Sequence, residues 1–303
     1  MPVAIHYSRH FNPVLAGAPA AAFTLGTQVG VPTGTSLTPT EDLPSPDATE
    51  TITLTHPVTG ATRDVEVLVW QDRLWTDRLS LSPGVGETYL FRRCEWDVTG
   101  GGGNFFAVDV DPTNGAEDQM EPLVIMRDCT LLGTLTDRVL HASHMWLERT
   151  HVEGTDDAWY GMSHSVAAVC NFIARAGAEG SHCDAVQSVA GGNFTLWRPW
   201  MEAEEAFPEA AEATSNAALR IGTDVAAIDG VTVRYAGLSG GGYSLQVRGD
   251  PPLLVSNVDV QGCRWLDDAR FGPVDFGEPG EVTDVTWSDN AYVLGGDTIT
   301  SPV

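Results

Sequence analysis

A short phrase recurs along the chain and limits what it can fold into: an apolar residue, any residue, Asp or Asn, an apolar residue, any residue, and an apolar residue. Counted at the apolar residue after the Asp or Asn, clear copies lie at Cys129, Phe172, Phe194, Val258 and Val285, with degenerate copies at Thr150 and Val231. The successive gaps are 21, 22, 22, 37, 27 and 27 residues. One coil of a parallel β-helix uses about 20–25 residues and tolerates insertions in its loops, so the spacing predicts a solenoid.

Equivalent positions of successive coils stack into ladders along a solenoid. The position before each apolar anchor is expected to form one such ladder, made of Asp128, Arg149, Asn171, Asn193, Gly230, Asn257 and Asp284. Asn and Asp suit a tight bend because they tolerate left-handed backbone and bond their own main chain. We therefore expect a turn at this ladder, and we expect the anchors to point into the core.

The predicted fold class is all-β: a right-handed, single-stranded parallel β-helix preceded by an extended N-terminal arm and a short β segment. Residues 1–45 are rich in Pro, Gly, Thr and Ala and show no sustained period, which indicates an arm that lies on another surface. Residues 46–303 are assigned to the β-helix domain.

Two local features interrupt the coils in this prediction. Residues 51–55 and 65–70 alternate in polarity on either side of a turn, which predicts a hairpin. The stretch 201–218 has helical character and falls in the 37-residue gap, so we expect a loop insertion that carries a short helix broken at Pro208.

Charge and composition exclude several classes of partner. The formal net charge is −25, and all 16 basic residues are Arg. Nucleic acid and anionic lipid are bound through clustered Lys and Arg, so neither is an expected partner. No apolar run approaches the roughly 20 residues of a membrane-spanning helix. The five Cys include no CxxC pair, which favours small buried side chains over a disulfide framework.

Two motifs come close to metal sites without matching them. Residues 109–121 resemble a calcium loop, but the Gly comes one position late, so a turn with solvated carboxylates is expected. His141 and His144 are three residues apart, and on a strand such side chains point to opposite faces. We therefore predict no metal and no cofactor. No catalytic residue is assigned, since nucleophile and phosphate-loop motifs are absent from the sequence.

The densest polar cluster is GSHCDAVQ at 180–187. His182 and Asp184 flank Cys183 and are expected to share a face, with Asp156 and Asp157 about one coil away. Two interpretations stay open. One is a ladder of turn residues, and the other is the paired carboxylates of a carbohydrate-cleaving β-helix.

Nine Trp are more than the core of a slim solenoid needs. Some of them, beside the Glu-rich stretch or next to Tyr, are expected to form a stacking surface for sugars or a contact between subunits. Together with the polar cluster they give the predicted binding residues, which are Trp159, Tyr160, His182, Asp184, Trp197 and Trp200.

Two of these segments resemble a known family. GVPTGTSLTP at 30–39 is similar to the G-V-P-x-G-T-x-L-T-P opening found ahead of pectate-lyase-like β-helix domains in bacteriophage minor tail proteins and related actinobacterial proteins. GSHCDAVQ resembles the G-x-H-x-D-x-x-Q coil of that family, with Ala185 where Gly is usual. The resemblance implies a component of the virion tail tip or tail fibre that faces the host envelope, often as a homotrimer.

The expected function is that of a structural virion protein located in the phage tail. It would bind other virion proteins through its arm and host cell-wall glycan through its loops. The alternative is a polysaccharide depolymerase or lyase, because a fold alone does not choose between the two. An enzyme needs a groove with converging carboxylates, whereas a structural protein needs none.

Overall fold

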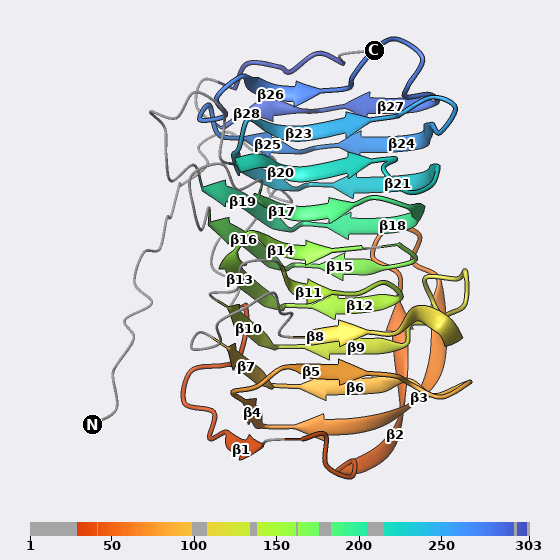
Figure 1. Ribbon diagram of the computed structural model, residues 1–303, viewed down its shortest axis with the longest axis vertical. Helices are drawn as coiled ribbons and strands as arrows, with labels where there is room; N and C mark the ends of the chain where they lie inside the picture. The colour runs from red at the N-terminus through yellow and green to blue at the C-terminus, as the bar shows by residue number, and fades with distance from the viewer. Residues whose placement is uncertain are drawn as a thin grey trace.

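The computed structural model describes residues 29–40, 42–98, 108–133, 138–161, 163–175, 183–204, 215–293 and 296–301. Their strands form three sheets that run along the whole stack of coils. The N-terminal coil is at the bottom of Figure 1 and the C-terminal coil is at the top. β2 pairs with β3 and is antiparallel to it, whereas every other strand up to β25 pairs in parallel with the third strand after it. The predicted parallel β-helix is confirmed.

The sheets are named A, B and C. Sheet A contains β1 (Thr38–Thr40), β4 (Arg73–Trp75), β7 (Glu95–Val98), β10 (Thr130–Gly133), β13 (His151–Thr155), β16 (Asn171–Arg175), β19 (Trp200–Glu204), β22 (Gly237–Gly240), β25 (Arg264–Trp265) and β28 (Ala291–Tyr292). Sheet B contains β2 (Ala48–Thr55), β3 (Thr62–Gln71), β6 (Tyr89–Arg92), β9 (Val124–Arg127), β12 (Met145–Glu148), β15 (Val166–Ala168), β18 (Gly191–Trp197), β21 (Ile228–Arg234), β24 (Val255–Gln261) and β27 (Val285–Ser288). Sheet C contains β5 (Leu79–Leu81), β8 (Val108–Val110), β11 (Arg138–His141), β14 (Asp157–Tyr160), β17 (Cys183–Ser188), β20 (Ser215–Gly222), β23 (Tyr243–Arg248) and β26 (Gly272–Asp275).

The recurring phrase marks two corners of the coil, not one. At the corner from sheet B to sheet A, the left-handed residues are Asp72, Arg93, Asp128, Arg149, Val169, Arg198, Tyr235, Gly262 and Asp289. At the start of the sheet B strands, they are His144, His164 and Asp284, which precede β12, β15 and β27, and Asn193, Gly230 and Asn257, which are the third residues of β18, β21 and β24. The single ladder expected from the sequence was wrong because the phrase fits both corners, and Asn171 lies at neither, since it begins β16. The left-handed backbone expected at this ladder is confirmed at the other six positions.

Charges alternate along the lower part of the corner from B to A. Arg93 donates two hydrogen bonds of 2.7 Å to the carboxylate of Asp72. Arg149 binds Asp128 in the same two-pronged way, over 2.6 and 2.9 Å. These bonds raise the pKa of both arginines. The ladder thus ties neighbouring coils together outside the core.

Val169 stands at this corner with φ 57°, a conformation that a β-branched residue adopts only at a cost. We expect Val169→Asn to raise the free energy of unfolding by about 1 kcal/mol, because Asn tolerates the left-handed region. Urea denaturation checks this. Ala168→Asn, one position earlier and equally half-buried on β15, is the control and should give no gain. A loss of stability in Val169→Asn would contradict the strain.

Small side chains follow the left-handed residue at this corner and point inward. The thiols of Cys94, Cys129, Cys170 and Cys263 each lie 3.3–3.5 Å from the carbonyl oxygen two residues earlier, and the hydroxyl of Thr150 does the same. All five Cys are buried and free. Burial raises the pKa of Cys170 and Cys263 to about 12, so these thiols are structural and unreactive.

The hairpin predicted around residues 51–70 is confirmed as β2 and β3. It rises along one side of the stack (Figure 1). Its buried residues pack against apolar residues of sheet B. This second core contains Leu54, Val67, Val69, Leu90, Ile125, Trp146 and Val166. At the hairpin's turn, buried His56 contacts Gln119 over 2.8 Å and Thr195 over 3.4 Å. Sheet B strands are therefore apolar on both faces where the hairpin covers them.

Both ends of the described solenoid are covered by chain. Residues 29–40 lie along sheet A, where Gly30 bonds the Arg149 carbonyl and β1 pairs with β4. The expectation that the arm lies on another surface holds for this part, and residues 1–28 fall outside the described residues. At the other end, Ile299 is 8% exposed, and its carbonyl accepts a bond from the Trp287 indole.

The helical insertion expected at 201–218 was wrong at both of its edges. Residues 201–204 belong to β19 and residues 215–218 to β20, while 205–214, with Pro208, fall outside the described residues. Among the described residues the helical content is one 3₁₀ turn, Pro112–Asn114, capped by the Asp111 side chain. None of their helices is long and apolar enough to cross a bilayer.

Candidate functional site

Polar side chains stack in a row along sheet C, one from each coil at the same register. The row consists of Asp109, His141, Tyr160, Gln187, Arg220, Gln246 and Asp275. Several members contact the next: His141 Nδ1 lies 2.9 Å from Asp109 Oδ1, and Gln246 donates to Asp275 over 3.2 Å. Coils are about 4.8 Å apart, so the row places these groups at a regular spacing along the molecule. Gln187, in the middle of the row, is buried, and the other six members are half-buried.

Beside this row lies a buried pair of carboxylates from adjacent coils. Asp157 is 6% exposed and Asp184 is 0% exposed. Asp157 Oδ1 accepts a bond of 2.9 Å from the Asp184 main-chain N–H, and Asp184 Oδ1 accepts one of 2.8 Å from the Ala217 N–H. The Gln187 amide donates to Asp157 over 3.0 Å and accepts from Arg220 over 2.9 Å. The pair and its partners therefore span three coils, those of β14, β17 and β20.

Burial dominates the electrostatics of this pair. It raises the pKa of Asp184 to about 7, against an attraction to Arg220 that lowers it. It also raises the pKa of Asp157, and the neighbouring Asp184 charge adds to that rise. Raised carboxyl pKa values are typical of general acids, but a general acid must reach its substrate. With Asp184 fully buried, the pair lacks that access in this structure.

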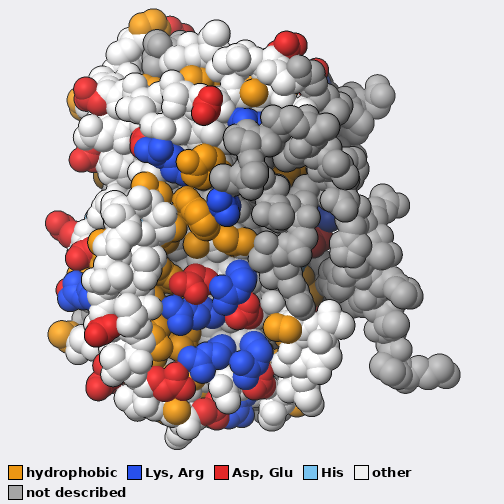
Figure 2. Space-filling view, turned by 180° about the vertical axis from the view of Figure 1, so that it is seen from behind, with side chains coloured by type: hydrophobic (Ala, Val, Ile, Leu, Met, Phe, Trp, Pro, Cys, Tyr) orange, Lys and Arg blue, Asp and Glu red, His pale blue; other side chains and the backbone are white. Residues whose placement is uncertain are grey.

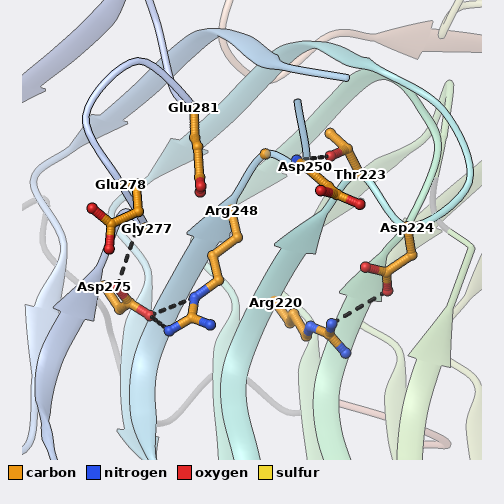
Figure 3. A pocket seen from close by; sticks show the side chains of 10 residues that line it. Arg220, Thr223, Asp224, Arg248, Asp250, Asp275, Gly277, Glu278 and Glu281 are labelled. Carbon is orange, nitrogen blue, oxygen red and sulfur yellow. Dashed lines mark hydrogen bonds and ion pairs between the residues drawn. The ribbon is translucent and has the colours of Figure 1, made fainter. Parts of the chain in front are cut away.

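The row ends in a cleft of about 410 Å³ on the last coils of sheet C, shown in Figure 3. Arg248 donates two bonds, of 2.8 and 2.6 Å, to Asp275, and Arg220 bonds Asp224 over 3.3 Å. Three further carboxylates line the cleft, those of Asp250, Glu278 and Glu281. The balance of charge is acidic, which suits a ligand rich in hydrogen-bond donors and disfavours an anion.

No group of three or more His, Cys, Asp or Glu with metal-site geometry occurs in the described ranges. The region that resembled a calcium loop contains the 3₁₀ turn, where Asp111 accepts from the Thr113 N–H over 2.9 Å.

The predicted binding residues do not form one site. Trp159 is fully buried, stacks on Phe172 at a centroid distance of 5.4 Å and donates to the Ala142 carbonyl. It cannot form part of a surface, because its strand turns that side chain into the core. Its neighbour Tyr160 is half-buried in the sheet C row, with the Arg138 guanidinium 3.4 Å from its ring centre.

The polar cluster at 180–187 is placed in part. Asp184 pairs with Asp157 as described above, so the expectation that neighbouring coils contribute a second carboxylate is met by Asp157. His182 falls outside the described residues.

Trp197 and Trp200 lie on either side of the corner from sheet B to sheet A, and both are half-buried. The Trp200 indole donates to Glu202 over 3.1 Å, and its ring covers Gly237, where a Cβ would come within 2.4 Å of it. Beside Trp197, the Arg198 guanidinium lies 4.3 Å from the indole ring centre.

Figure 2 shows charged side chains of both signs over the lower coils and hydrophobic side chains above them.

The sequence reasoning missed Arg198 and Tyr235, which share this corner. The guanidinium lies 5.9 Å from the Tyr235 ring centre, so it sits between two aromatic rings. Arg198 could have been identified by comparing it with the other arginines at the same corner position. Arg93 and Arg149 each have an Asp one coil below, whereas Arg198 has Val169 below and Tyr235 above.

The fold and these surfaces define a parallel β-solenoid with a polar row on one sheet and an aromatic corner on another. Comparison with models of known protein families, with curated proteins and with solved structures finds no match.

Proposed function

We propose that this chain is a structural, non-catalytic protein of a bacteriophage virion, part of the tail, that contacts glycan on the host surface. The observation that carries the proposal is the row of seven polar side chains along sheet C. A rigid stack that carries a half-buried hydrogen-bonding group on six of these seven coils can contact an extended polymer over many sugar units. The assignment to the tail rests on the resemblance at residues 30–39 and 180–187.

Burial of the carboxylate pair supports a role without catalysis. A polysaccharide-cleaving enzyme needs two carboxylates that reach the scissile bond from opposite sides. The raised pKa of Asp184 is the observation that favours the enzyme as a second candidate, and its complete burial weighs against it. Each carboxylate of the pair accepts a hydrogen bond from the main chain of the next coil, Asp157 from Asp184 and Asp184 from Ala217, which gives the pair a structural role.

The attachment of the chain to other virion proteins is proposed to run through the N-terminal arm. Residues 42–45 are engaged with the first coil, where the carbonyls of Asp42 and Pro44 accept bonds from Trp75 and Trp70. A fair test therefore deletes residues 1–28 only.

We expect the 1–28 deletion to keep the melting temperature of the full chain and to be lost from purified particles. Circular dichroism checks the fold, and immunoblotting of particles checks incorporation. Normal incorporation of the deleted chain would contradict attachment through the arm.

A further inference from the structure

Trp197, Arg198 and Tyr235 place two aromatic rings and a guanidinium together at the corner from sheet B to sheet A. This group of side chains is separate from the sheet C row. Trp197 ends β18, Arg198 is the left-handed residue that follows, and Tyr235 is its equivalent one coil above. Tyr235 is 36% exposed, and its ring lies over Gly262, where a Cβ would come within 2.5 Å of it. The glycine therefore lets the ring lie along the surface.

The Trp197 indole stands apart from the other eight. All nine Trp are described, and six donate their N–H: Trp70, Trp75, Trp146, Trp159, Trp200 and Trp287. The N–H groups of Trp96 and Trp265 have no partner among the described residues either, but both are buried in the core, out of reach of a ligand. Trp197 is half-buried, and within the described residues its N–H has no hydrogen-bond partner. The Tyr235 hydroxyl likewise has none among them.

Arg198 adds an uncommitted positive charge to these donors. In the part of the chain that the structure describes, it forms no ion pair or hydrogen bond, and its Nε atom is buried. The equivalent Arg93 and Arg149 each bind an aspartate. A lone guanidinium is unusual on a chain of net charge −25, where carboxylates outnumber arginines.

We propose that this corner binds a sugar that carries a carboxylate or a phosphate. The rings of Trp197 and Tyr235 offer apolar faces for the sugar's C–H groups, and their N–H and O–H groups can donate to its hydroxyls. The planar guanidinium of Arg198 matches a carboxylate or phosphate with two parallel bonds. The proposal rests on the glycan contact proposed above and names its anionic class and its place.

Isothermal titration calorimetry on the full-length chain tests this with three probes: trigalacturonate, its methyl ester and glucose 6-phosphate. The ester keeps the rings and removes the charge. We expect trigalacturonate, glucose 6-phosphate or both to bind, the ester to bind at least about tenfold more weakly than trigalacturonate, and Arg198→Gln to weaken binding of the charged probes by about tenfold or more. Preference between the two charged probes identifies the anionic group.

Trp197→Phe should keep part of the affinity, since it keeps a ring and loses the N–H, whereas Trp197→Ala should abolish binding. Arg63→Gln, which removes an exposed arginine paired with Asp118 and Glu121 on the hairpin, is the matched control and should bind as the unmodified chain does. Circular dichroism confirms that each variant folds.

The proposal is overturned by equal binding of the ester, by unchanged binding in Arg198→Gln, or by no binding of either charged probe. If a host envelope polysaccharide still binds the chain in that case, the glycan contact stands and only this site fails. If that polysaccharide does not bind either, the proposed function fails with it.

Discussion

Asp184→Asn is expected to stabilise the protein at pH 8 and to leave its stability nearly unchanged at pH 4. Burial raises the pKa of Asp184 to about 7 from an ordinary value of 3.8. Between these values the folded state binds more protons than the unfolded state, so the free energy of unfolding falls as pH rises. The contribution is fully present below pH 4 and is lost as pH passes 7.

The size of this effect is at most about 4 kcal/mol, since one pKa unit corresponds to about 1.4 kcal/mol. Asn keeps an oxygen for the Ala217 N–H and carries no charge, so the variant should lose the pH dependence that Asp184 contributes. Urea denaturation at pH 4, 6 and 8 measures it. Asp157 remains in the variant, and its own raised pKa leaves a slope of the same sign.

Glu66→Gln is the control for this experiment, because Glu66 is an exposed carboxyl on β3. It should follow the unmodified chain at every pH. A variant Asp184→Asn that is destabilised equally at pH 4 and pH 8 would show that Asp184 is not a buried, proton-binding group.

The second large effect concerns tryptophan. Trp159→Ala should lower the free energy of unfolding by about 3–5 kcal/mol, the usual loss for a buried aromatic side chain. Trp159 is 0% exposed, packs against Phe172 and bonds the Ala142 carbonyl. Trp197→Ala removes a half-buried ring from the surface corner and should cost about 1 kcal/mol or less.

Urea denaturation of the two variants side by side separates a core residue from a surface one. If Trp159→Ala does not fold, Trp159→Phe preserves most of the ring and should fold with a smaller loss. Equal stability of the Trp159→Ala and Trp197→Ala variants would contradict the assignment of Trp159 to the core.

The repeat spacing was enough to predict the solenoid but not to align every coil. Asp128 and Arg149 were placed correctly at a turn, because the left-handed bend requires a residue type that the sequence displays. Asn193 belongs to a different corner, since both corners select the same phrase. Only the hydrogen-bonded register separates them, and register is a long-range property that short motifs do not contain.

The candidate sites were predictable to a lesser degree. The pairing of Asp184 with a carboxylate one coil away followed from the coil length, and the structure shows Asp157 there. The sequence could not show whether Trp159 faces the core or the surface. Its neighbours on β14 are also apolar or aromatic, so there is no alternation of polar and apolar residues to indicate which side chains point inward. The surroundings of Arg198 depend on the residues at the same corner position in the coils above and below it. Those residues can be named only after the ladders have been aligned.

The most direct test of the central claim, contact with a host glycan without cleavage, is to incubate the full chain with envelope polysaccharide from host cells. Cosedimentation measures binding, and reducing-end assay of the supernatant measures release of sugar. We expect binding with no release above a protein-free control, for the unmodified chain and for Asp184→Asn alike. Release by the unmodified chain that disappears in folded Asp184→Asn would contradict it and identify an enzyme.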